Sequence, residues 1–145
     1  MTVDIDLLGP VVALALWTMI MLFWAVFKVQ KGLKSGVDLG DTPRGARGRD
    51  LDGRMDAKWL WARQNYEHLV EQPTIFYAVV IVLALLGQGQ VLNIGLAWAY
   101  VALRIAHSIV QAAGRSRSVT FVLSTFVLLA LVVHACAAWL HLAIG

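Results

Sequence analysis

The stretch LLGPVVALALWTMIMLFWAVF, residues 7–27, contains no charged side chain and decides the class of fold. A helix needs about 20 mainly apolar residues to cross the hydrocarbon core of a bilayer, and this run has that length. Asp4 and Asp6 precede it, where a signal peptide would carry basic residues, and no small-residue cleavage site follows it. We therefore expect a retained transmembrane helix over residues 7–29.

Three further apolar stretches have the same character. They predict transmembrane helices over residues 56–87, 91–113 and 118–144. The period-two alternation that is typical of transmembrane strands does not occur. The expected fold class is an all-α integral membrane protein, in which four transmembrane helices form a bundle and residues 1–145 form a single domain.

The composition supports a membrane protein. Of the 145 residues, 59% are hydrophobic and only 14% are charged, whereas soluble proteins carry about a quarter charged residues. The single cysteine, Cys136, lies in an apolar run without metal-ligand spacing, so neither an internal disulfide nor a metal site is expected. Nearly all the Lys and Arg residues lie within residues 28–63 and 115–117. Positively charged membrane loops commonly have this distribution, so it gives no reason to expect a nucleic-acid partner.

The segments between the helices predict the topology. Residues 30–55 are rich in Gly, Asp and Arg and have no apolar periodicity, as expected of a solvated loop. Residues 87–93 and 114–117 are short links, which make successive helices antiparallel neighbours. Lys and Arg occupy the 30–55 loop and the 114–117 link but neither terminus, so both connections should be cytoplasmic and both termini should lie on the opposite side.

Ionisable residues inside the spans cost a few kcal/mol on insertion scales and need an explanation. The second predicted helix carries a set spaced i, i+4 and i+8, with a histidine beside it: Arg63, Glu67, Glu71 and His68. The third carries a set spaced i, i+3, i+4 and i+7: Arg104, His107, Ser108 and Gln111. Because Arg117 begins the fourth helix, three helices place charged groups at one depth. Such a pocket suits a small zwitterionic or anionic ligand.

Structural interpretations of the same residues are also open. Arg104 would neutralise Glu71 between packed helices, while Arg63 and Arg117 would extend to lipid headgroups. His134, alone near the other end of the fourth helix, is expected to be a hydrogen-bonded interior residue.

Three motifs, in order, resemble those of the MAPEG family, the membrane-associated proteins in eicosanoid and glutathione metabolism. Residues 63–77 read RQNYEHLVEQPTIFY, residues 104–108 read RIAHS and residues 117–121 read RSVTF. The first motif is most similar to the bacterial branch, and the other two are similar to the prostaglandin E synthase branch. His68 stands where the family usually has Asn, Gln111 replaces a Tyr, and Phe121 replaces an aromatic residue with a hydroxyl group.

The resemblance implies a homotrimer in a bacterial inner membrane, with glutathione as co-substrate bound between adjacent subunits near the cytoplasmic face. Arg117 would hold the glutathione sulfur as thiolate, and Ser118 would donate a hydrogen bond beside it. Glu71 would meet the ammonium of the γ-glutamyl group. The other glutathione-binding positions that the resemblance implies are Arg63, His68, Arg104, His107 and Gln111.

One arginine is sufficient for the chemistry. A free thiol has a pKa of about 8.5, and lowering it by about two units requires about 2.7 kcal/mol. A guanidinium at about 4 Å supplies up to about 4 kcal/mol at an effective dielectric constant of about 20. The expected activity is a glutathione-dependent transferase or peroxidase acting on a lipophilic electrophile that is dissolved among the membrane lipids.

Two other functions remain open. One is a non-catalytic trimeric scaffold or lipid-binding protein, in which the polar cluster is structural. The other is a small proton-coupled exporter. An exporter would need an acidic residue in the first helix, which has none from Leu7 to Phe27, and Glu71 would then be the lone proton carrier.

Overall fold

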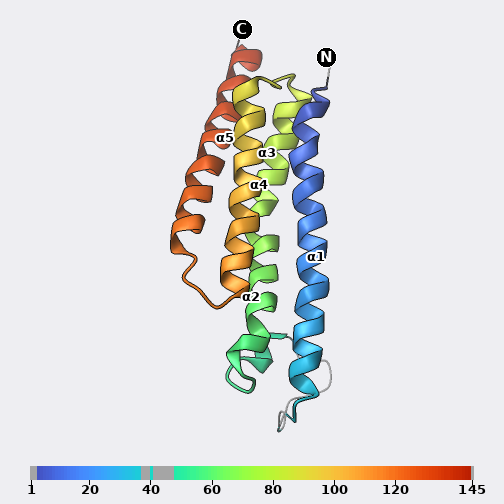
Figure 1. The fold of residues 1–145 in the computed structure, drawn as a ribbon. Coiled ribbons are helices and arrows are strands. Elements are labelled where there is room, and N and C mark those ends of the chain that lie inside the picture. Colours follow the sequence, from blue (N-terminus) through green and yellow to red (C-terminus); the bar gives the residue numbers. More distant parts are fainter. Residues whose placement is uncertain (1–2, 37–39, 41–47, 145) are drawn as a thin grey trace.

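A computed structural model describes residues 3–36, 40 and 48–144, and every regular element in these ranges is helical (Figure 1). The two short 3-10 helices are η1 (Ile5–Leu7) and η2 (Gly48–Leu51). The α-helices are α1 (Leu8–Leu33), α2 (Ala57–Glu71), α3 (Pro73–Leu85), α4 (Val91–Ala112) and α5 (Ser118–Ile144). The elements pack into one elongated bundle (Figure 1).

The described residues contain four helical spans that are long and apolar enough to cross a membrane: Ile5–Leu33, Ala57–Leu85, Val91–Ala112 and Ser118–Ile144. Successive spans run in opposite directions, so both termini lie at one end of the bundle (Figure 1). The connection from α1 to α2 and the link from α4 to α5 lie at the other end (Figure 1). The predicted fold class, an all-α integral membrane bundle of four helices, is confirmed.

The first helix extends to Leu33, four residues beyond the predicted boundary. The apolar run ends at Phe27, but the polar residues that follow it, such as Gln30, remain helical. The backbone N–H of Lys34 still donates to the Gln30 carbonyl at 3.1 Å. Gly36 follows with φ +88°, a left-handed conformation that glycine adopts without steric cost. The membrane boundary and the helix boundary are therefore different positions on this chain.

The second span is broken into α2 and α3, where the sequence predicted one continuous helix. Pro73 has no N–H to donate to a preceding carbonyl, and it occupies the first position of α3, where that N–H is not needed. Gln72 lies at the break, and its side chain donates to Thr125 Oγ1 of α5 at 2.9 Å. As a result α2 packs mainly on α1 and α4, whereas α3 packs on α5 and α1.

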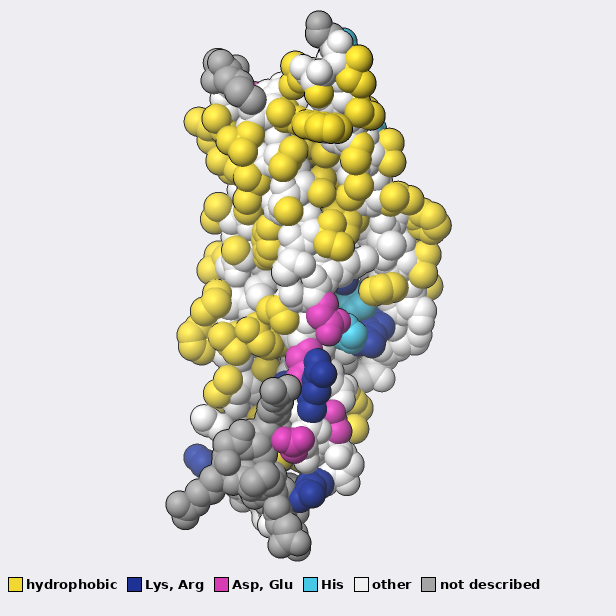
Figure 2. Space-filling view, turned by 180° about the vertical axis from the view of Figure 1, so that it is seen from behind, with side chains coloured by type: hydrophobic (Ala, Val, Ile, Leu, Met, Phe, Trp, Pro, Cys, Tyr) yellow, Lys and Arg dark blue, Asp and Glu magenta, His cyan; other side chains and the backbone are white. Residues whose placement is uncertain are grey.

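Close packing of apolar side chains forms the interior. Phe76 of α3 stacks on Tyr100 of α4 with ring centroids 4.5 Å apart, and Leu14 and Met21 of α1 are fully buried. Large apolar side chains also cover the outside, as Figure 2 shows over the upper half of one face. Within a bilayer, van der Waals contact and hydrogen bonds hold such helices together, because lipid is as apolar as the core.

Two hydrogen bonds of Asp4 hold the chain together at the end of the bundle that carries the termini. The backbone N–H of Asp4 donates to the Ala84 carbonyl at 3.0 Å, and the Asp4 carboxylate accepts from the Gly89 N–H at 2.5 Å. Asp4 therefore joins the start of the chain to the turn between α3 and α4.

Replacing Asp4 with Ala should lower the free energy of unfolding by about 1–2 kcal/mol, because a hydrogen bond to a charged acceptor is lost. Thermal unfolding in detergent measures the effect. Asp6→Ala removes the same charge from an exposed position and is the matched control. An equal loss in both variants would assign the effect to charge and not to the bond with Gly89.

Candidate functional site

Charged and histidine side chains gather in the lower half of one face of the bundle, below a largely apolar upper half (Figure 2). They come from α2, α4, the start of α5 and the connection that precedes α2. The contacts divide them into two groups. We name them the Arg63 cluster (Asp52, Arg63 and Glu67) and the histidine cluster (His68, Glu71, Arg104, His107 and Thr120).

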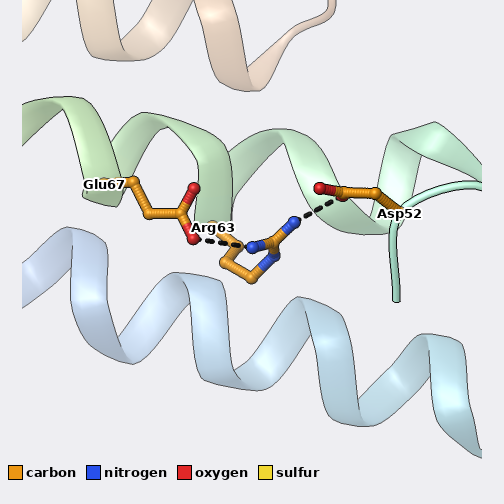
Figure 3. Close-up of polar contacts among 3 residues, drawn as sticks. All are labelled: Asp52, Arg63 and Glu67. Atoms are coloured by element: carbon orange, nitrogen blue, oxygen red, sulfur yellow. Dashed lines mark hydrogen bonds and ion pairs between the residues drawn. The ribbon is translucent and has the colours of Figure 1, made fainter. Parts of the chain in front are cut away.

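Arg63 is held between two carboxylates (Figure 3). Its Nη1 lies 2.6 Å from Glu67 Oε1, one turn along α2, and its Nη2 lies 2.5 Å from Asp52 Oδ1. Only 8% of Arg63 is exposed. Gly48 packs so closely that a Cβ there would lie 2.9 Å from Arg63 Cδ. Arg63 therefore fastens the segment before α2 to the bundle, and its charge is already balanced.

The histidine cluster begins with a pair on α2. His68 Nδ1 lies 3.3 Å from Glu71 Oε2. The His68 ring also meets the His107 ring of α4 edge to face, with centroids 6.4 Å apart. His107 Nδ1 lies 3.3 Å from the Thr120 hydroxyl of α5, and its Nε2 is buried without a partner in the described structure. Side chains from α2, α4 and α5 thus meet in this cluster, and the α5 member is Thr120, where the sequence analysis expected Arg117.

Arg104 is the most unusual member of this cluster. It is 1% exposed, and its Nε donates to the Tyr100 hydroxyl at 3.0 Å. Its Nη2 is buried without a hydrogen-bond partner, and no carboxylate of the described residues lies within ion-pair distance. The Phe121 ring lies 5.8 Å from its Cζ. A buried cation without a counter-ion is expensive, and an anion bound beside Arg104 would reduce that cost.

The alternative in which Arg104 neutralises Glu71 is therefore not what the structure has, because Glu71 pairs with His68. The Glu71 side chain is 58% exposed on the outer surface of the bundle. Arg104 and Glu71 thus remain separate charges of opposite sign, one inside the bundle and one on its surface. Together they suit a ligand that carries both a carboxylate and an ammonium group.

Arg117 and Ser118 lie at the junction of the α4–α5 link with α5. They border a hollow of about 300 Å³, to which Gln111 of α4 and Trp61 of α2 also contribute. Arg117 is half-buried and close enough to His107 for their charges to interact, and no ion pair of the described residues involves it. The side chains and backbone that line the hollow are mostly polar, so it suits a small polar molecule.

Two residues outside the predicted set of site residues, Asn65 and Thr120, belong to this region. Asn65 Nδ2 donates to Gln111 Oε1 at 3.0 Å, both side chains are buried, and Asn65 Oδ1 has no partner in the described structure. Thr120 contacts His107. Both residues stand inside motifs quoted above, and this is the signal that would have found them.

Of the predicted site residues, the structure therefore gathers Glu71, His68, Arg104 and His107 in one cluster. It places Arg117, Ser118 and Gln111 at the adjoining hollow. Arg63 lies apart from them, bound to its own two carboxylates.

Comparison with known proteins gives one match. The sequence model of the MAPEG family matches residues 7–137, from the first span into the fourth. Neither the curated proteins nor the solved structures contain a match to the chain. Since the family match covers most of the chain, the chain belongs to the MAPEG family.

Proposed function

We propose that this protein is a membrane-bound glutathione-dependent transferase or peroxidase, which stabilises the glutathione thiolate for attack on a lipophilic electrophile. The observation that carries the proposal is the buried Arg104, whose Nη2 has no partner in the described structure. Arg117 is a second cation without a carboxylate partner among the described residues, and Arg104 and Arg117 both lie near His107. Glutathione offers two carboxylates, one ammonium group and a thiol, which match two free cations and the exposed Glu71.

We assign the roles that the family resemblance implies to the residues at these positions. Arg117, at the hollow, would stabilise the thiolate, and Ser118 would donate a hydrogen bond to it. Glu71 would accept hydrogen bonds from the γ-glutamyl ammonium group. The groups proposed for the carboxylates and peptide oxygens are His68, Arg104, His107 and Gln111. Arg63 would act indirectly, by holding Glu67 and Asp52 in place.

A homotrimer fits the same surface. Glu71 lies on the outside of the chain beside the exposed apolar side chains of Val70 and Ile75. A carboxylate that faces lipid costs a few kcal/mol, so a neighbouring subunit that covers this face would relieve the cost. The bound glutathione would then lie between subunits. We also propose a bacterial inner membrane location, with the 30–55 loop and the 114–117 link in the cytoplasm, because Lys and Arg concentrate there.

The proposed reaction uses the bilayer as the source of the second substrate. The thiolate sulfur attacks an electrophilic carbon and forms a C–S bond, while the displaced electron pair leaves with the leaving group or is protonated. Phe121, which is partly exposed, contacts the histidine cluster and gives the electrophile an apolar route from lipid. Burial near Arg117 strengthens the attraction between guanidinium and thiolate, because water screens it less.

A second function is supported by one contact. Asn65 donates a buried hydrogen bond to Gln111, so these two polar side chains already join α2 to α4. A non-catalytic trimeric scaffold or lipid-binding protein would keep such contacts without turnover. In that case removing Arg117 would alter assembly or stability and nothing else.

The test is a glutathione titration of the purified protein in detergent, followed by the ultraviolet absorbance of the thiolate. We expect a saturable signal at millimolar glutathione, from protein that native mass spectrometry shows to contain three chains. S-methylglutathione, which has no ionisable thiol, should compete without giving a signal. Absence of a signal from folded, assembled protein would overturn the transferase proposal.

A further inference from the structure

Three lysines surround one indole where α1 and α2 meet. The ammonium groups of Lys28, Lys31 and Lys58 lie 5.4, 6.0 and 5.4 Å from the ring centroid of Trp59. Cations at this distance from an aromatic face are attracted to it. We call these four residues the Trp59 lysine cluster. It concentrates positive charge at the end of the bundle that carries the α1–α2 connection.

The ring is fixed in place by a glycine. A Cβ on Gly32 of α1 would lie 2.8 Å from Trp59 Cγ and 2.8 Å from Met55 Sδ. Only a residue without a side chain allows α1 and the start of α2 to approach so closely. Close packing therefore fixes the position of the indole ring. The lysines around it are positioned before any ligand binds.

The charge of this region is not balanced within the described structure. Lys58 pairs with Asp56 at 2.7 Å. Lys28, Lys31 and Lys34 have no ion-pair partner among residues 3–36, 40 and 48–144. Three ammonium groups within two turns of α1 repel one another, so an anion that bound between them would be stabilised.

A groove of about 280 Å³ runs beside the cluster and is lined by Phe27, Gln30, Lys31 and Lys34. These positions are spaced i, i+3, i+4 and i+7 and therefore form one stripe along α1. Phe27 is 62% exposed at the apolar end of the stripe, and Lys34 lies at its polar end. The groove thus suits an amphiphile with an anionic head.

The depth of the groove identifies the occupant. Phe27 is the last residue of the apolar run that begins at Leu7. At about 1.5 Å of rise per residue, Lys31 lies about 6 Å and Lys34 about 10 Å beyond Phe27 along the helix. The headgroup layer of each leaflet is about 5–7 Å thick, so Lys31 stands at the level of the lipid phosphates and Lys34 just beyond.

We propose that this groove binds an anionic phospholipid. Lys31 and Lys34 hold the phosphate, Gln30 hydrogen-bonds the headgroup, and an acyl chain lies along Phe27. Lys28, kept near Trp59, adds attraction from the side. The lipid site uses none of the residues of the histidine cluster. A test of lipid binding is therefore independent of the glutathione proposal.

Native mass spectrometry of delipidated protein with added phosphatidylglycerol or phosphatidylcholine tests the site. We expect one phosphatidylglycerol per chain, bound at least tenfold more tightly than phosphatidylcholine. The double variant Lys31→Gln/Lys34→Gln should lose at least tenfold in affinity, because each basic residue near an anionic lipid surface contributes about fivefold. Lys31→Arg/Lys34→Arg keeps both charges and should bind within about threefold of the unmodified protein.

Lys58→Gln is the matched control, because it removes one charge from the same end at a lysine that is already paired with Asp56. It should change binding by less than about twofold. Equal losses in Lys58→Gln and the double Gln variant would overturn the proposal in favour of general surface charge. Equal binding of the two lipids, or displacement of phosphatidylglycerol by inorganic phosphate at the same concentration, would overturn it as well.

Discussion

Replacing Arg117 with Ala should remove the thiolate signal of glutathione and lower turnover by at least about twentyfold at neutral pH. If Arg117 lowers the pKa of the bound thiol by about two units, its loss returns that pKa to about 8.5. The thiolate fraction at pH 7 then falls from about three quarters to about 3%. Thiolate absorbance in the glutathione titration, and the initial rate with a reactive aromatic electrophile, measure the two effects.

The controls separate the local effect of Arg117 from net charge and from folding. Arg49→Ala removes an exposed arginine of η2 at the same end of the bundle and should leave the signal within about twofold. Arg117→Lys keeps a cation at the position and should raise the thiol pKa less than Ala does. A full thiolate signal in assembled Arg117→Ala protein would show that another group stabilises the sulfur. Loss of assembly in Arg117→Ala, together with no thiolate signal from the assembled unmodified protein, would favour the scaffold.

The four spans could be predicted because a bilayer sets the length of each apolar run. The break in the second span was also present in the sequence, since Pro73 removes a backbone donor at a known position. The helices against which α2 and α3 pack on either side of this break could not be predicted. The different neighbours of α2 and α3 depend on how Gln72, Thr125 and the surrounding side chains pack, and no local pattern records that.

Contacts within one helix were predicted more easily than contacts between helices. The i, i+4 spacing placed Arg63 and Glu67 on one helix face, and the structure joins them in an ion pair, although Arg63 had been expected at lipid headgroups or at glutathione. The second carboxylate on Arg63 comes from Asp52, in a segment without apolar periodicity, so no sequence rule points to it. The pair Asn65–Gln111 joins positions 46 residues apart and depends on the rotation of α2 against α4.

The buried cation could be recognised from the sequence as an expensive residue, but its lack of a partner could not. Arg104 was expected to pair with Glu71 if its role were only structural. In the structure Glu71 instead pairs with His68, and Arg104 Nη2 has no partner among the described residues. The distribution of counter-ions depends on which face each helix turns inward, and that is fixed only by packing.

Replacing Arg104 with Met should therefore separate binding from stability. Glutathione affinity should fall by at least about a hundredfold, because truncating a buried partner of a charged ligand costs about 2–5 kcal/mol. The free energy of unfolding should stay the same or rise by about 1–3 kcal/mol, because an unpaired buried charge is removed and Met fills a similar volume. The glutathione titration and thermal unfolding in detergent, on the same preparation, measure both.

Arg104→Lys is the control that keeps the charge, and it should retain more affinity than Met without gaining stability. A structural arginine would behave in the opposite way, since its removal would destabilise the bundle and leave any bound thiol unaffected. Loss of stability by several kcal/mol in Arg104→Met would thus contradict the proposal that this side chain awaits an anion. Opposite signs for binding and stability are the result that a structural role does not produce. The cost of an unpaired cation in the membrane would then be explained by the ligand that it binds.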